Sequence, residues 1–248
     1  MKKLNIILSI LTISVSLLFN SCVDFAKEVK GDGKLVTKSI NISDFSKIDI
    51  ETYVEVNYSQ EKNTGKLEFT IDQNLWEYYD IHTKNHVLYI KLKSEYRNKF
   101  SMNPTKSVLT VSSEQFNNVD IAGSSTFNFC TAFVSEKLNI DIAGSAKLYA
   151  NKYPIKIEDL IIDLAGSNNI YLAGTVQKAK IDIAGSAQVD ALECEFAHLS
   201  VDIAGSGDVT AHVTQKLNVD IAGSGTVKFK GDPHVTTDIA GSGKVKKL

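Results

Sequence analysis

The chain has 248 residues, of which 43% are hydrophobic and 23% are charged, a balance typical of a folded globular protein. This composition argues against a disordered chain and against a multi-span membrane protein. The 27 basic and 29 acidic side chains give a formal net charge of −2, and Arg97 is the single arginine. Because the chain lacks a basic footprint, nucleic acid is not an expected partner.

The first 21 residues are typical of a signal peptide. Lys2 and Lys3 precede a mostly apolar run over 6–19 that is too short to span a bilayer comfortably. A Ser-Cys pair ending at Cys22 follows and resembles a bacterial lipobox, in which the cysteine is lipidated and becomes the new N-terminus. We therefore expect lipid attachment at Cys22, a tether over 22–33 and an outer-membrane lipoprotein on the periplasmic or cell-surface side. An uncleaved helical anchor and ordinary secretory cleavage are the alternatives.

The remaining cysteines and the histidines predict no disulfide framework and no metal site. Only Cys130 and Cys194 are left once Cys22 carries lipid, and no CxxC motif occurs. His82 and His86 have the spacing of two metal ligands on a helix, but the residues around them alternate as in strands. We expect no metal, no cofactor and no catalytic residue.

A five-residue word, Asp-Ile/Leu-Ala-Gly-Ser, recurs seven times at intervals of 18 to 22 residues, which is the range of solenoid repeats. Its aspartates are Asp120, Asp141, Asp163, Asp182, Asp202, Asp220 and Asp238. Apolar residues alternate on both sides of each word, which predicts two short strands with inward-facing side chains. The glycine between them should form a structural turn with positive φ or a close backbone approach. These glycines are Gly123, Gly144, Gly166, Gly185, Gly205, Gly223 and Gly241.

Stacking such units gives an all-β fold, a single-stranded parallel β-helix over residues 34–248. A right-handed helix is favoured by the usual hand of parallel crossovers, and a left-handed hexapeptide helix is the rival. Residues 113–248 supply the seven word coils, and 34–112 are expected to form about three longer, degenerate coils. The aromatic residues Trp76, Tyr78 and Tyr79 either pack in the core or cap, or form a carbohydrate-stacking platform.

The word aspartates alternate with inward Ile or Leu, so they should point outward and form one file along the stack. Like charges about 4.8 Å apart repel, which requires compensation. We expect each carboxylate to accept hydrogen bonds from the amides or the serine hydroxyl of a glycine corner. Calcium bridging and pairing with lysine are the alternatives.

The lipobox, the FSKIDI segment at Phe45 to Ile50 and the repeated DIAGSG words resemble the putative auto-transporter adhesin, head GIN domain family. The resemblance covers nearly all of the mature chain. It implies a right-handed β-helix of pectin-lyase-like shape, without conserved catalytic residues and with a role in cell adhesion. The glycine-rich pattern is relaxed at four corner residues, where less regular corners are expected: Ala146, Asn168, Asn169 and Ala187.

Two functions from different classes fit these observations. The first is a non-enzymatic surface or periplasmic lipoprotein that binds a glycan or an envelope protein through its long faces; the sequence does not fix its oligomeric state. The second is a polysaccharide-binding or polysaccharide-degrading protein. Paired carboxylates such as Asp190 and Glu193, or Glu193 and Glu195, could serve as acid and base. Arg97, however, lies in a polar loop outside the regular coils, and no word is interrupted, which favours binding.

Overall fold

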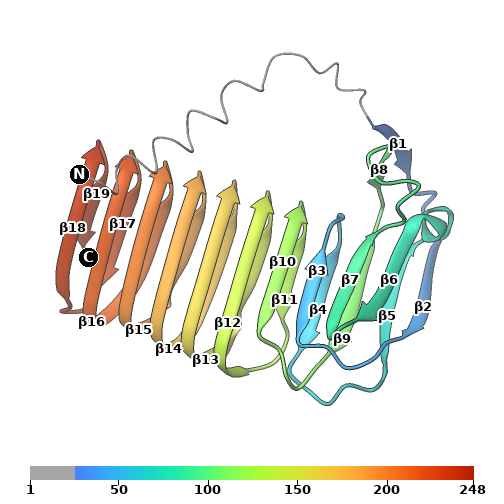
Figure 1. The fold of residues 1–248 in the computed structure, drawn as a ribbon, viewed down its shortest axis with the longest axis horizontal. Helices are drawn as coiled ribbons and strands as arrows, with labels where there is room; N and C mark the ends of the chain where they lie inside the picture. Colours follow the sequence, from blue (N-terminus) through green and yellow to red (C-terminus); the bar gives the residue numbers. More distant parts are fainter. Residues whose placement is uncertain (1–25) are drawn as a thin grey trace.

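The computed structural model describes residues 26–248, so the expected signal peptide and Cys22 lie outside the described residues. The chain folds as a stack of strands closed at one end by a cap (Figure 1). No helix within the described range is long and apolar enough to cross a membrane.

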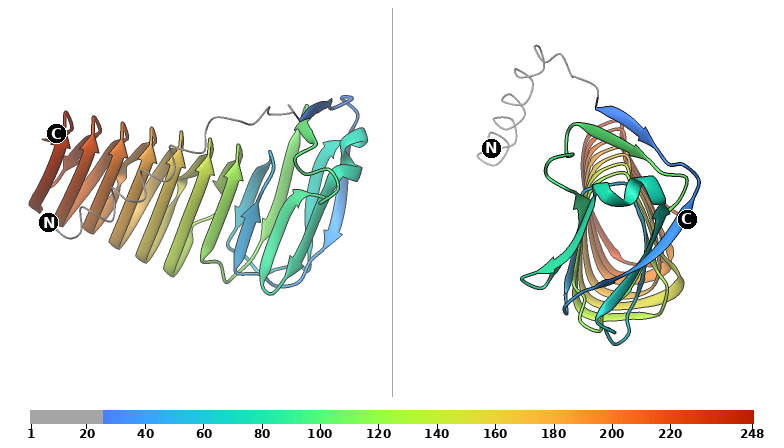
Figure 2. Two further views of the ribbon diagram at one scale, coloured as in Figure 1. Left: turned by 45° about the horizontal axis from the view of Figure 1, so that its top comes forward. Right: turned by 90° about the vertical axis from the view of Figure 1, so that its right-hand side faces the viewer.

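The repeated words form a parallel β-solenoid, which confirms the predicted fold class. Each coil pairs in parallel with the next, and the words align residue by residue: Asp163 lies opposite Asp182, which in turn lies opposite Asp202. The longer strands run from one glycine corner around the coil to the next corner (Figure 2). The stack comprises β10 (Asn118–Gly123), β11 (Thr126–Phe129), β12 (Phe133–Gly144), β13 (Lys147–Gly166), β14 (Asn169–Gly185), β15 (Gln188–Gly205), β16 (Asp208–Gly223), β17 (Thr226–Lys230), β18 (His234–Gly241) and β19 (Lys244–Lys247).

The core is a set of apolar columns that run through the stack. Residues at equivalent places in successive words lie opposite one another and are almost fully buried, for example Ile162, Ile181 and Val201. One coil alone could not bury these side chains, because its neighbours supply both the ladder hydrogen bonds and the opposing apolar surface. The words therefore fold cooperatively with the coils on either side.

The segment over 34–112 differs from the three degenerate coils that we expected. β3 (Lys47–Ile50) and β4 (Glu55–Ser59) do form one layer of the solenoid, pairing in parallel with β10 and β11. β7 (Val87–Leu92) and β9 (Ser107–Ser112) form a second parallel layer beyond them. The chain thus forms the layer of β3 and β4 first, then the more distant layer of β7 and β9, and then returns to β10 beside β3 to begin the word coils.

The remaining strands of this segment form an antiparallel cap rather than a third coil. β2 (Leu35–Asn41) pairs with β5 (Lys66–Asp72), and β6 (Tyr79–Lys84) pairs with β7 in antiparallel register. A tight turn in which Asn85 and His86 both have positive φ reverses the chain, which a coil corner would not do. The cap also covers an edge that would otherwise remain open to pairing with another chain.

The aromatic residues of the cap serve mainly in packing. The 3-10 helix η1 (Gln73–Tyr78) crosses the end of the stack and buries Leu75 completely. Tyr79 is also buried, and the rings of Trp76 and Phe69 lie 6.0 Å apart. A carbohydrate platform formed by this cluster is therefore disfavoured.

The described part of the expected tether is not a free linker, because residues 27–30 form a strand and a buried carboxylate fastens the segment after it to the cap. Asp72 is fully buried and accepts hydrogen bonds from the Gly33 and Thr105 amides, each at 2.8 Å. Burial alone would raise the pKa of Asp72, but hydrogen bonds from Thr105 and from backbone amides outweigh it and lower the pKa. This cluster holds the ends of β1 (Lys27–Lys30) and β8 (Phe100–Asn103), which pair in parallel.

At the opposite end of the stack the last coil combines polar and apolar residues; Ile239, for example, continues an apolar column and is 39% exposed. Thr237 and Lys247 occupy the inward columns that Val219 and Phe229 fill one coil earlier. Lys247 forms an ion pair with Asp232. Polar residues at these places suit a terminal coil and oppose end-to-end pairing of the exposed edge.

Candidate binding face

The glycine corners are set by both backbone conformation and close approach. All seven word glycines have φ between +106° and +139°, a region that L side chains rarely adopt. In six of them, an added Cβ would lie 2.2 to 2.5 Å from the carbonyl oxygen of the preceding word glycine. Gly123 is the exception, with nothing within 4 Å. The following serine amide donates to that same carbonyl, as in Ser206 to Gly185 at 2.8 Å.

The corners with relaxed glycine patterns are as regular as the others, contrary to our expectation. Gly144, Gly166 and Gly185 stay in register through the coils that carry Ala146, Asn168 and Ala187. The reason is that the side chain after the word serine points inward and is accommodated there. Asn168 is buried, and its Oδ1 accepts a hydrogen bond from the Ala146 amide at 2.9 Å.

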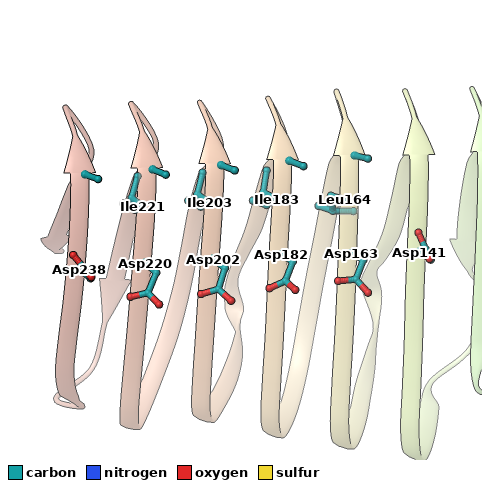
Figure 3. A pocket seen from close by; sticks show the side chains of 15 residues that line it. Asp141, Asp163, Leu164, Asp182, Ile183, Asp202, Ile203, Asp220, Ile221 and Asp238 are labelled. Atoms are coloured by element: carbon teal, nitrogen blue, oxygen red, sulfur yellow. The ribbon is translucent and has the colours of Figure 1, made fainter. Parts of the chain in front are cut away.

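The outward side of the word strands, which we call the word face, carries two parallel files of side chains. The Asp file contains the seven word aspartates and a further member, Asp49, which pairs with Asp120. The second, the Ala file, follows two residues later along each strand and so lies on the same face. It consists of Ala122, Ala143, Ala165, Ala184, Ala204, Ala222 and Ala240. The labelled aspartates form one row across the strands in Figure 3.

A shallow groove of about 670 Å³ runs along these two files from Asp141 to Asp238. The small alanine side chains leave its floor low, and the carboxylates line it along its whole length. With a strand spacing of about 4.8 Å, the six coils from Asp141 to Asp238 span about 24 Å. The groove thus presents the same chemical pattern repeatedly to a ligand that extends along the stack.

The aspartates are not held by the glycine corners, so that prediction was wrong. The corner amides are already used in the ladder between coils, which leaves them unavailable to the carboxylates. Two lysines instead offset part of the repulsion between the carboxylates. Lys47 pairs with Asp120, and Lys180 pairs with Asp182 and lies 3.4 Å from Asp202. Each lysine lies two residues before an aspartate of the file on the same strand, Lys47 before Asp49 and Lys180 before Asp182, and so shares its face.

Crowding changes the acidity of several members of the file. Burial, followed by the charges of Asp182 and Asp141, raises the pKa of Asp163. Burial and Asp182 likewise raise the pKa of Asp202, although Lys180 opposes the shift. Burial and the charge of Glu51 raise the pKa of Asp49. The file therefore carries net repulsion that the two lysines only partly offset.

The other residues considered from the sequence do not form a second site. Cys130 is half-buried and Cys194 fully buried, and both are free thiols. Arg97 forms an ion pair with Glu51 at 3.0 Å, beside the cap. Within residues 26–248, no group of three or more His, Cys, Asp or Glu side chains could hold a metal ion.

Sequence reasoning found the Asp file but missed the groove beside it. The Ala file was present in the word itself, since Ala follows Asp by two positions and must share its face. Asp49 could also have been added to the file, because the spacing of Ile48 and Ile50 already matched the words. The pairing of Lys47 with Asp120 required knowledge that β3 lies beside β10, which sequence order does not reveal.

Comparison with known proteins agrees with this architecture. A putative lipid binding protein from Parabacteroides distasonis ATCC 8503 is 27% identical, with a TM-score of 0.72, over 90% of this chain and 100% of that chain. A putative adhesin from Parabacteroides merdae ATCC 43184 is 26% identical, with a TM-score of 0.63, over 90% of this chain and 100% of that chain. A putative adhesin from Bacteroides fragilis NCTC 9343 shares the fold, with 21% identity and a TM-score of 0.80, over 89% of this chain and 100% of that chain.

No curated protein sequence matches this chain. The model of one family, described as putative auto-transporter adhesin, head GIN domain, matches residues 44–233. That range includes β3, β4 and all the word coils except the last. This chain belongs to the putative auto-transporter adhesin, head GIN domain family.

Proposed function

We propose that this chain is a non-enzymatic envelope lipoprotein that binds an extended macromolecule along the word face. The observation that carries the proposal is the groove over the Asp and Ala files, whose lining repeats from coil to coil. A repeating groove suits a polymer, because each coil adds one more set of similar contacts. The expected lipid at Cys22 would hold the protein at the outer membrane, on its periplasmic or surface side.

A hydroxyl-rich glycan is the ligand class that fits this lining best. Carboxylates accept hydrogen bonds from hydroxyl groups, and the alanine methyl groups offer an apolar floor for the carbon-bound faces of sugar rings. The name of the related P. distasonis structure raises a lipid as another ligand. A row of carboxylates along an open groove disfavours an acyl chain, which needs an enclosed apolar site.

The structure offers little support for the alternative of polysaccharide cleavage. Asp190 and Glu193 are exposed side chains on β15, and neither lines the groove of the word face. The words keep their register through every coil, without the local interruption that catalytic sites usually introduce. Incubation with uronic-acid polysaccharides should therefore yield no unsaturated ends or new reducing sugar, and any such product would revive the enzyme hypothesis.

The binding proposal is tested on an array of host and bacterial polysaccharides. In the variant Ala184→Arg/Ala222→Arg, two long side chains would fill the floor of the groove. The matched control, Gln188→Arg/Thr226→Arg, adds the same charge on the strands that follow the corners. We expect the first variant to lose binding at least tenfold and the control to retain it. Equal binding by both variants, or no polysaccharide bound by the parent, would contradict the proposal.

A further inference from the structure

The expected lipid anchor lies close in sequence to one corner of the cap. Cys22 precedes Lys27 by five positions, so even a fully extended connection spans only about 18 Å. Lys27 begins β1 and lies opposite Phe100 of β8, and its amide donates to the Lys99 carbonyl at 2.9 Å. A lipid on Cys22 would therefore bring this corner, where β1 and β8 lie side by side, near a membrane surface (Figure 2).

The segment 93–100, which we call the cap loop, is well structured at this corner. The Arg97 amide donates to the Lys93 carbonyl at 3.1 Å, and the Phe100 amide donates to the Tyr96 carbonyl at 3.2 Å. The ring of Tyr96 lies 4.7 Å from that of Tyr78 and 5.9 Å from that of Phe100. The loop thus presents a small aromatic cluster, and tyrosine is enriched where a membrane meets water.

Basic residues predominate within the cap loop itself, and the acidic side chains of Glu77 and Glu95 also lie near Tyr96. Lys93, Arg97 and Lys99 outnumber the one acidic residue of the loop, Glu95, and Arg97 is already paired with Glu51 outside the loop. Lys27, Lys93 and Lys99 are exposed and form no ion pair with any residue from 26 to 248. Lysines with free ammonium groups beside interfacial aromatic rings match the chemistry of an anionic phospholipid surface.

We propose that the cap loop docks on the head groups of anionic phospholipids when the protein is anchored through Cys22. The inference rests on the lipid anchor of the proposed function and adds an orientation to it. The capped corner faces the bilayer, and the solenoid extends from it for about 34 Å, the seven strand spacings between Asp49 of β3 and Asp238 of the last word. Short tether, free lysines and aromatic cluster all lie at this one corner.

The test uses the full-length lipidated chain in vesicles of phosphatidylcholine and phosphatidylglycerol that contain a head-group nitroxide lipid. Cys130→Ser leaves Cys194 as a thiol that is fully buried and does not react with a dye. A fluorophore is then attached through Ser94→Cys in the cap loop, or through Gln215→Cys as a remote control. Gln215 is exposed and lies midway along β16, between two glycine corners. We expect severalfold stronger quenching at Ser94 than at Gln215.

The matched charge variants separate docking from simple proximity. Each lysine near an anionic surface strengthens association about fivefold, so Lys93→Gln/Lys99→Gln should weaken docking by about 25-fold and lower the quenching at Ser94. Lys228→Gln/Lys230→Gln removes the same charge near the far end and should have no effect. Equal quenching at both labels, or no response to the first variant, would overturn the docking inference while leaving the anchor intact. If the chain fails to float with vesicles and Cys22→Ser changes nothing, the anchor itself is wrong and the inference falls with it.

Discussion

Alanine substitution at two word glycines separates the two reasons why the corners need glycine. Gly123 and Gly205 have similar backbones, with φ of +122° and +133°, so alanine should cost about 1 to 2 kcal/mol in conformational strain at either position. Only Gly205 has a neighbour in the way: its Cβ would lie 2.4 Å from the Gly185 carbonyl oxygen. The comparison therefore isolates the close approach between coils.

The added cost at Gly205 follows from what must move. Ordinary contact would require the two backbones to separate by nearly 1 Å, which would weaken the hydrogen bond from the Ser206 amide to the Gly185 carbonyl. A compromised buried backbone hydrogen bond costs about 1 to 3 kcal/mol. We expect Gly205→Ala to lower the free energy of unfolding by about 2 to 5 kcal/mol, and Gly123→Ala by about 1 to 2 kcal/mol. Urea denaturation followed by circular dichroism measures both, and equal losses would refute the close-approach argument.

Four further results are expected. Asp163→Asn should stabilise the protein by about 0.5 to 1 kcal/mol at neutral pH and low salt, because it removes the repulsion from two neighbouring aspartates. This gain should shrink at high salt. It should also be smaller for Asp238→Asn, because Asp238 has one neighbour in the file. The free energy of unfolding should rise as the pH falls from neutral toward 3.8, the pKa of an aspartate in the unfolded chain, because the raised pKa of Asp163 makes the folded state bind a proton more readily. Below pH 3.8 the free energy of unfolding should fall, because the lowered pKa of Asp72 makes the unfolded state bind a proton more readily than the folded state. A steady decline across the whole acidic range in thermal melts would count against this assignment. Melting temperatures in calcium and in chelator should agree within about 1 °C, and a large rise in calcium would point to metal bridging of the Asp file. Mass spectrometry should find Cys130 and Cys194 unpaired within one molecule, because they lie in different coils and Cys194 is fully buried.

The word coils could be predicted from sequence because each residue type has one structural task at a fixed place. The alternation of Ile and Asp determines which side chains face inward, and the glycine marks the corner. Since every coil repeats this pattern, the register of Asp163, Asp182 and Asp202 follows directly from aligning the words. Parallel stacking then accounts for the core without further information.

The cap and the compensation of the Asp file could not be predicted in the same way. Alternating strands such as β5 and β7 have the same sequence pattern whether they pair in parallel or antiparallel, so the periodicity left their partners undetermined. The corner amides do not donate to the word aspartates as expected, because they already donate to the preceding coil, as the Ser206 amide does to the Gly185 carbonyl. Which lysine reaches which aspartate depended on strand neighbours that are distant in sequence.

The dependence of binding on ligand length tests the central claim most directly. If the word face binds an extended polymer, oligomers of the polysaccharide that the array identifies should bind more tightly with each added unit until they span the groove, about 24 Å for the coils from Asp141 to Asp238. Longer oligomers should then gain little, and Ala184→Arg/Ala222→Arg should remove the dependence. Affinity that is independent of length in the parent, or a length dependence unchanged in that variant, would contradict binding along the word face.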